Sequence, residues 1–125
     1  MPGTVDKATI ARNPDAWSFA SATGGIVNTT TAVTLKPAPA DATQRNYLTD
    51  LQIATDALGA ATELAIRDGA GGAVLWRGKL QTAALVVTMI GFQEPLQGSP
   101  GNLLEVVTLT AVTGGVYVNA QGYTG

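Results

Sequence analysis

The feature that most constrains this chain is a succession of short β-type runs, separated by turns rich in glycine and proline, that begins at Ala16. Apolar, β-branched and aromatic residues fill the runs, as they do in β-strands. Such runs at this spacing are typical of all-β sandwiches and barrels. The expected strands lie at residues 16–23, 26–35, 47–54, 63–67, 73–77, 81–93, 103–112 and 116–121. We therefore expect one all-β domain of about eight strands over residues 16–125.

The sequence around Asp68-Gly69 is the clearest turn. Two more glycines, Gly71 and Gly72, follow it between apolar runs. Glycine adopts the positive φ angles that tight hairpin loops need, so a β-hairpin is expected here. The proline-containing residues 36–46 and 95–102 are expected to be loops.

The run at residues 47–54 alternates with a period of two, as a half-buried strand does. The alternation predicts that Tyr47, Leu51 and Ile53 face inward and that Asp50 and Gln52 lie on the opposite face. A helix competes over residues 50–66, which are rich in alanine and leucine. Three threonines and a glycine weaken that helix, and a short helical turn at residues 55–61 is kept as an alternative.

Two later runs are apolar on both faces, at residues 85–92 and 103–109. Strands covered on both faces normally belong to sheets sandwiched by helices, and this chain offers no helices for that purpose. A second protein surface is the natural cover, which predicts an oligomer. The predicted interface residues are Val86, Thr88, Ile90, Tyr117 and Asn119. The alternative is a thick two-sheet core with a covering loop inside one chain.

Residues 1–15 contain two prolines, a glycine and mixed charges without a sustained period. This pattern suits an extended N-terminal arm. Val5, Ile10 and Arg12 are its candidate docking residues, and a loose end is the alternative.

The composition offers little material for chemistry. The chain has no histidine and no cysteine, so zinc, copper, thiolate and serine–histidine sites are not expected. Its nine carboxylates form no spaced pair, and the Asp68 turn has Ala70, Gly72 and Lys79 where a calcium loop needs oxygen ligands. The sequence therefore predicts a protein that is not an enzyme and that carries no cofactor or metal.

Charge and hydropathy exclude two further classes of partner. Only 13% of the residues are charged, with seven basic side chains scattered along the chain, where about 25% is usual. Nucleic-acid binding needs many phosphate contacts, so it is not expected. No apolar run is long enough to span a membrane, and no signal peptide is evident, so we expect a soluble protein made in a cytoplasm.

Trp17 and Trp76 are the side chains best suited to a sugar-binding platform. Each lies among apolar strand residues, which favours packing in the core or at an interface.

The C-terminal third resembles a known family. The resemblance is based on Ile90-Gly91-Phe92, Pro95-Leu96, residues 101–105 and residues 116–123. Together they are similar to the closing strands of the small tumour-necrosis-factor-like jelly rolls encoded by tailed bacteriophages. The resemblance covers residues 85–125, and the rest of the chain agrees in strand count and spacing only.

The resemblance implies a jelly-roll fold and a role as a capsid decoration, or cement, protein. Members of this group bind as homotrimers to the major capsid protein on the outside of an expanded head and strengthen it, often through an N-terminal arm. The alternatives are a trimeric receptor- or carbohydrate-binding fibre tip and a tail or connector subunit, with a small enzyme last.

Overall fold

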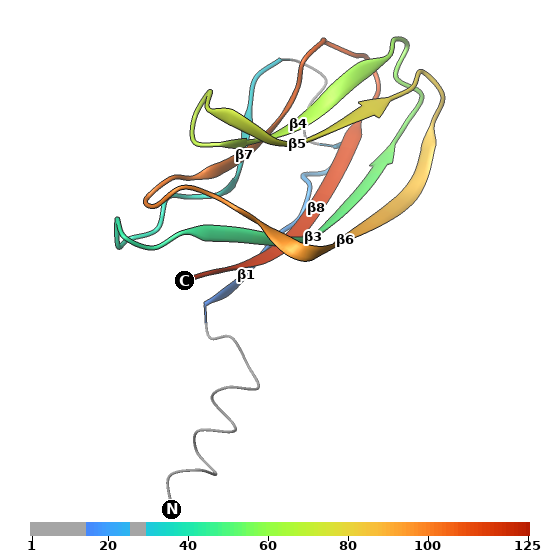
Figure 1. The fold of residues 1–125 in the computed structure, drawn as a ribbon. Helices are drawn as coiled ribbons and strands as arrows, with labels where there is room; N and C mark the ends of the chain where they lie inside the picture. The colour runs from blue at the N-terminus through green and yellow to red at the C-terminus, as the bar shows by residue number, and fades with distance from the viewer. Residues whose placement is uncertain (1–14, 26–29) are drawn as a thin grey trace, which may run out of the picture.

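The computed structural model describes residues 15–25 and 30–125, and these form a β-sandwich (Figure 1). The arm residues Val5, Ile10 and Arg12 lie outside the described residues. The described part of the chain contains eight strands and no helix, so the all-β prediction is confirmed and the helical alternatives at 50–66 and 55–61 are wrong. The strands are β1 Ala16–Phe19, β2 Val33–Lys36, β3 Asn46–Thr55, β4 Thr62–Asp68, β5 Ala73–Leu80, β6 Leu85–Gln97, β7 Leu104–Thr108 and β8 Val116–Thr124.

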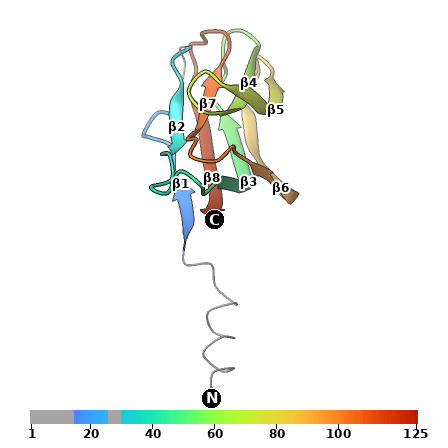
Figure 2. The same cartoon turned by 60° about the vertical axis from the view of Figure 1, so that its left-hand side comes forward.

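The strands form two four-stranded antiparallel sheets, which face each other as two layers (Figure 1, Figure 2). Sheet I has the order β1-β8-β3-β6, and sheet II has the order β2-β7-β4-β5. The first strand of the chain pairs with the last, the second with the last but one, and so on toward the middle of the series. This nesting of β1 with β8, β2 with β7, β3 with β6 and β4 with β5 is the order of an eight-stranded jelly roll.

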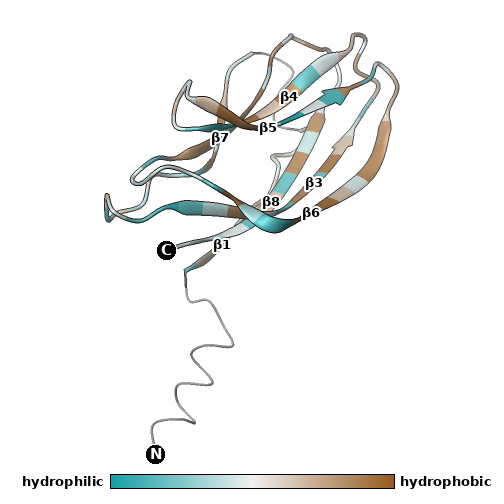
Figure 3. Cartoon of the chain, in the orientation of Figure 1, coloured by the Kyte–Doolittle hydropathy of each residue, from teal (hydrophilic) through white to brown (hydrophobic). Residues whose placement is uncertain are grey.

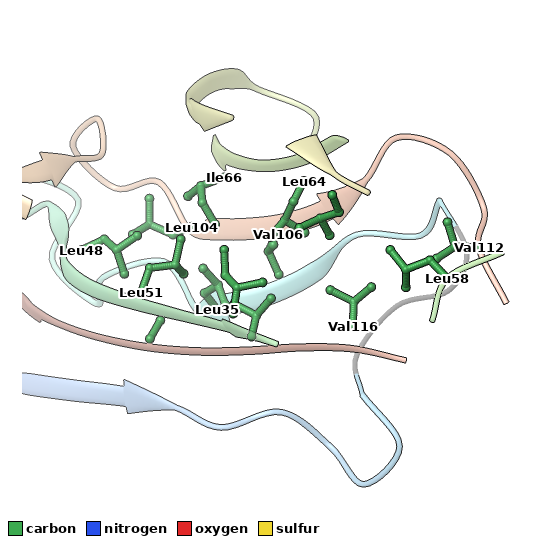
Figure 4. Close-up of a cluster of buried hydrophobic side chains, with 14 residues drawn as sticks. Leu35, Leu48, Leu51, Leu58, Leu64, Ile66, Leu104, Val106, Val112 and Val116 are labelled. Carbon is green, nitrogen blue, oxygen red and sulfur yellow. The ribbon is translucent and has the colours of Figure 1, made fainter. Parts of the chain in front are cut away.

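Both sheets supply the core that lies between them (Figure 4). Leu48, Leu51 and Val118 of sheet I are almost fully buried, and they meet Leu64 and Val106 of sheet II. Burying one such side chain contributes about 1.5–3 kcal/mol. Leu58 and Val112 close the core from the loops at one end of the sandwich.

A bulge in β3 changes the face that Tyr47 occupies. The register with β8 shifts between Leu48 and Asp50, so that Leu48 and Leu51 both face the core. Tyr47 lies on the other face and stacks on Tyr123, with ring centroids 4.6 Å apart. The prediction that Tyr47 faces inward was therefore wrong, whereas Leu51 and Ile53 are buried as predicted.

Strand β6 is longer at its C-terminal end than the sequence predicts and begins four residues later. It continues through Pro95, which the sequence assigned to a loop. Asp50 pairs with Gly91 and Leu48 pairs with Leu96, so residues 92–95 bulge out opposite Thr49. A proline is tolerated there because β6 is at the edge of sheet I and this stretch is bulged.

The two strands that are apolar on both faces differ in the structure. All five residues of β7 are buried, and β7 is an inner strand of sheet II. A single chain therefore covers it, and its two-sided pattern gives no reason to expect an oligomer. The alternative prediction, that such a strand is covered within one chain, is therefore correct for β7. It is not correct for β6, whose N-terminal half is exposed.

Candidate interaction surface

At the end of the sandwich that holds the β4–β5 loop, the carboxylates of Asp68 and Glu105 hold the loops in place. Asp68 accepts hydrogen bonds from the Ser99 backbone N–H (2.9 Å), the Ser99 hydroxyl (2.6 Å) and the Asn102 side-chain amide (3.1 Å). Desolvation acts to raise the pKa of Asp68, but these hydrogen bonds, together with the charge of Arg45, lower it below its usual value. The ionised carboxylate thus ties the β6–β7 loop to the end of β4.

Glu105 ties the β4–β5 hairpin to β7 in the same way. Its carboxylate lies 2.6 Å from the Arg67 guanidinium and accepts a 3.0 Å hydrogen bond from the backbone N–H of Gly71. The Glu105 side chain is only 7% exposed. Gly69 and Gly71 have positive φ angles in this loop, as the turn prediction requires. The loop is a β-hairpin turn that Glu105 holds against β7.

Acidic side chains do not gather into a metal-binding group in the described residues, and no set of three or more could hold a metal ion there. Likewise, the described residues contain no helix that could cross a membrane. A hollow of about 390 Å³ lies beside the start of β1, between Asp15, Lys36, Pro39 and Thr124. Short side chains form the rest of its wall, and no aromatic ring lines it.

Both tryptophans are half-buried in strands and pack against the core. The indole of Trp17 lies across Gly122 of β8, and the ring of Trp76 lies over Gly78 of its own strand. The Nε1 of Trp17 is buried and has no hydrogen-bond acceptor among the described residues. A sugar-binding fibre tip would place a tryptophan exposed on a loop, and the structure places neither one there.

The N-terminal half of β6 is the most exposed apolar segment that the structure describes. Val86, Val87 and Met89 are 85%, 61% and 74% exposed. The hydropathy colouring shows the same strand as a hydrophobic band at the edge of the molecule (Figure 3). The pairing with β3 shifts between Thr88 and Leu85, so Val86 and Val87 form a bulge opposite Ala54. No residue between Lys79 and Glu94 carries a charge.

The outer face of sheet I continues this surface with side chains that are mostly neutral, several of them polar. Met89 pairs with Gln52, and Gln52 pairs with Asn119, so these three side chains share a row on the face opposite the core. Tyr117 lies in the next row beside Ala54, and Tyr47 and Tyr123 stack further along. Asp50 and Glu94 are the charged residues among the described strand residues of sheet I. We call residues 85–89 of β6 together with this face the β6 surface.

The structure brings some of the predicted interface residues together and separates others. Tyr117 and Asn119 are half-buried on the outer face, and Val86 is exposed at its rim. Thr88 is exposed but pairs with the inward-facing Ile53, and its hydroxyl donates to the Val86 carbonyl (3.3 Å). Ile90 pairs with the buried Leu51 and packs against the core.

Two residues of the β6 surface, Val87 and Met89, are absent from the predicted interface. Strict alternation places them on the face opposite Val86, Thr88 and Ile90, and the pattern does not distinguish the two faces because both are largely apolar. The sequence signal that marks the segment as a whole is the absence of any charge from residue 80 to residue 93, which is unusual for an edge strand.

Comparison with known proteins finds distant likenesses in structure only. No protein-family model matches the sequence, and neither does any curated protein. A chain of the cyanophage Pam1 capsid asymmetric unit has a TM-score of 0.49 and 18% identity, covering 86% of this chain and 81% of that chain. The Tobacco streak virus coat protein has a TM-score of 0.42 and 11% identity, covering 90% and 88%.

A protein of another kind is about as similar as the coat protein is. The family 32 CBM from C. perfringens NanJ, solved in complex with galactose, has a TM-score of 0.43 and 12% identity, covering 85% of this chain and 91% of that chain. The chain therefore has distant structural similarity to viral capsid and coat proteins, among others. No function follows from matches at these values.

Proposed function

We propose that the protein is a structural component of a phage particle, a decoration protein that binds the outer surface of the head and stabilises it through protein–protein contacts. The single observation that carries a structural role is the β6 surface, which is exposed, apolar at its rim and almost free of charge. Contiguous exposed apolar surface of this kind marks protein interaction sites. The resemblance of residues 85–125 to phage decoration proteins supports the more specific role.

The chemistry of the sandwich agrees with a passive role. The well-placed polar groups that ligand sites require are engaged in holding loops, as Asp68 and Glu105 are. Burial of the exposed Val86, Val87 and Met89 against another protein would contribute about 25 cal/mol for each Å² removed from water. The neutral outer face would add contact area without the cost of burying unpaired charges.

The partners in this proposal are further copies of the chain and the major capsid protein. The resemblance implies a homotrimer, with Val86, Tyr117 and Asn119 as the predicted interface residues that lie on or beside the β6 surface. Absolute mass in solution, from size-exclusion chromatography with light scattering, tests the trimer directly.

Sedimentation of the protein with phage heads tests the decoration role. Expanded heads of the phage that encodes this chain, assembled without it, would be mixed with increasing amounts of purified protein. Saturable co-sedimentation, with a fixed number of copies per head and an increase in the temperature at which the heads break, is expected. An unrelated β-sandwich of similar size is the control. Binding that never saturates, or that the control equals, would show that the chain is not a decoration protein.

A further inference from the structure

The β6–β7 loop, residues 98–103, is bonded to both sheets at one end of the sandwich. It follows the last residue of β6 in sheet I and precedes the first residue of β7 in sheet II. Toward the start of β3 in sheet I, the backbone N–H of Gly98 donates to the Asn46 carbonyl (2.9 Å), and that of Gly101 donates to the Gln44 carbonyl (2.8 Å). Both bonds join uncharged backbone groups, so they do not depend on the protonation of a side chain.

Toward sheet II, the same loop is held by a carboxylate. Both oxygens of Asp68, the last residue of β4, accept hydrogen bonds: Oδ1 from the Ser99 backbone N–H (2.9 Å) and the Asn102 side-chain amide (3.1 Å), and Oδ2 from the Ser99 hydroxyl (2.6 Å). Hydrogen bonds to an ionised acceptor are roughly twice as strong as those between neutral groups. Protonation would remove the charge and place a hydrogen on an oxygen that already accepts. The attachment of Ser99 and Asn102 to β4 therefore depends on the ionisation of Asp68.

The surroundings of Asp68 favour its ionised form. Desolvation acts to raise the pKa of Asp68, but its hydrogen bonds and the charge of Arg45, which precedes β3, hold that pKa below its ordinary value of 3.8. The preceding residue of β4, Arg67, points to the opposite face of its strand and pairs with Glu105 of β7. The partner of Asp68 on β5 is the neutral Ala73, and residues 98–103 contain no titratable side chain.

These surroundings determine the pH at which the attachment is lost. A carboxylate whose pKa is lowered by folding stabilises the folded form above its ordinary pKa, and this contribution is lost as the pH falls through the lowered value. For Asp68 the window therefore lies below about pH 3.8.

We propose that Asp68 is an acid-released latch: its carboxylate holds Ser99 and Asn102 against sheet II, and protonation frees both of them. The backbone bonds toward sheet I remain, so the loop opens on one side only. A backbone bond from Gly69 to Leu103 (2.8 Å) and the full burial of Leu104 keep β7 in place. Both sheets thus stay folded while the loop opens. This inference concerns the loop alone and does not depend on binding to a phage head.

Hydrogen exchange of backbone amides, measured by NMR on the full chain near neutral pH, tests the latch. The variant is Asp68→Asn, which has nearly the shape of the protonated acid. The Ser99 amide should exchange at least about tenfold faster than in the unmodified protein, because a hydrogen bond to a charged acceptor is lost. The amides of Gly98 and Gly101 should exchange as before, because their acceptors lie toward sheet I.

Asp41→Asn is the matched control. The pKa of Asp41 is also lowered, by hydrogen bonds from the side chain and backbone of Thr43, but Thr43 is only two residues away in the same loop. Removing this charge should leave the exchange of the Ser99 amide unchanged.

The unmodified protein tests the same point without a substitution. As the pH falls below about 3.8, the amide resonance of Ser99 should move, while that of Val118 in the core strand β8 keeps its folded position. Three results would overturn the proposal. They are an Asp68→Asn variant with unchanged Ser99 exchange, equally faster exchange at Ser99, Gly98 and Val118, which would mean that the whole sandwich is destabilised, or a Ser99 resonance that stays fixed until acid unfolds the protein.

Discussion

At the scale of single residues, a site with no room for a side chain occurs at Gly122, where Trp17 and the backbone of Tyr47 close over β8. Gly122 of β8 lies beneath the indole of Trp17 and against the carbonyl oxygen of Tyr47. A Cβ atom at this position would lie 2.5 Å from Cζ2 of Trp17, closer than side chains approach in folded proteins. Glycine is needed there for space, since it lets β1 lie close to β8.

We therefore expect Gly122→Ala to lower the free energy of unfolding by about 1–3 kcal/mol, as overpacking of a well-filled site does. Urea denaturation measures it. Gly91→Ala is the matched control, because Gly91 lies in the same sheet and the nearest atom to its added Cβ is 3.4 Å away, an ordinary contact. The control should be neutral or slightly stabilising. Equal stabilities for the two variants would contradict the packing argument.

At the scale of secondary-structure elements, two ion pairs hold β4 to its neighbours and differ in burial. Arg67 and Glu105 join β4 to the inner strand β7, with side chains 23% and 7% exposed. Arg77 and Glu63 join β5 to β4, with side chains 48% and 45% exposed. Removing one partner of a buried pair leaves an uncompensated charge, whereas an exposed charge returns to water.

Arg67→Met should lower the free energy of unfolding by about 2 kcal/mol, somewhat less than for a fully buried pair because the arginine retains some contact with water. Arg77→Met, the control on the adjacent strand, should cost less than about 1 kcal/mol. The double variant Arg67→Met/Glu105→Leu should recover part of the loss, because no buried charge then remains. Urea denaturation at neutral pH measures these three losses. A loss for Arg77→Met as large as that for Arg67→Met would contradict this account.

The strands were predictable where the pattern is local. Alternation around Leu51 and Ile53, and the glycines after Asp68, each depend on residues close in sequence, and both predictions are confirmed. The face of Tyr47 was not predictable, because the bulge that reverses it arises from the register with β8, about 70 residues away. Pro95 is inside a strand for a similar reason, because its tolerance depends on β6 being an edge.

The surface was predictable in kind but not in detail. A two-sided apolar run indicates a covered strand, and the sequence contains two of them. Only the sheet order shows that β7 is an inner strand, covered by its own chain, and that β6 is an edge strand that is left open. For the same reason Ile90 was assigned to the interface, although its pairing with Leu51 directs it to the core. Sheet order is a long-range property that a single sequence does not display.

At the scale of the whole molecule, the two sheets share one core. Leu51 and Val118 come from sheet I, and Leu64 and Val106 come from sheet II, and all pack in a single cluster. Neither sheet could bury these side chains alone. The nested pairing of β1 with β8 also means that the described chain closes only when its two ends meet. Both features predict that the sandwich unfolds as one cooperative unit.

The two tryptophans make this prediction measurable, because Trp17 reports on sheet I and Trp76 reports on sheet II. In Trp76→Phe the fluorescence of Trp17 follows sheet I, and in Trp17→Phe the fluorescence of Trp76 follows sheet II. In each variant we expect the fluorescence transition in urea to coincide with that of far-UV circular dichroism, since the sheets lose their shared core together. A fluorescence midpoint clearly separated from the circular dichroism midpoint in either variant would show that one sheet persists without the other. In that case the common core could not be the main source of stability.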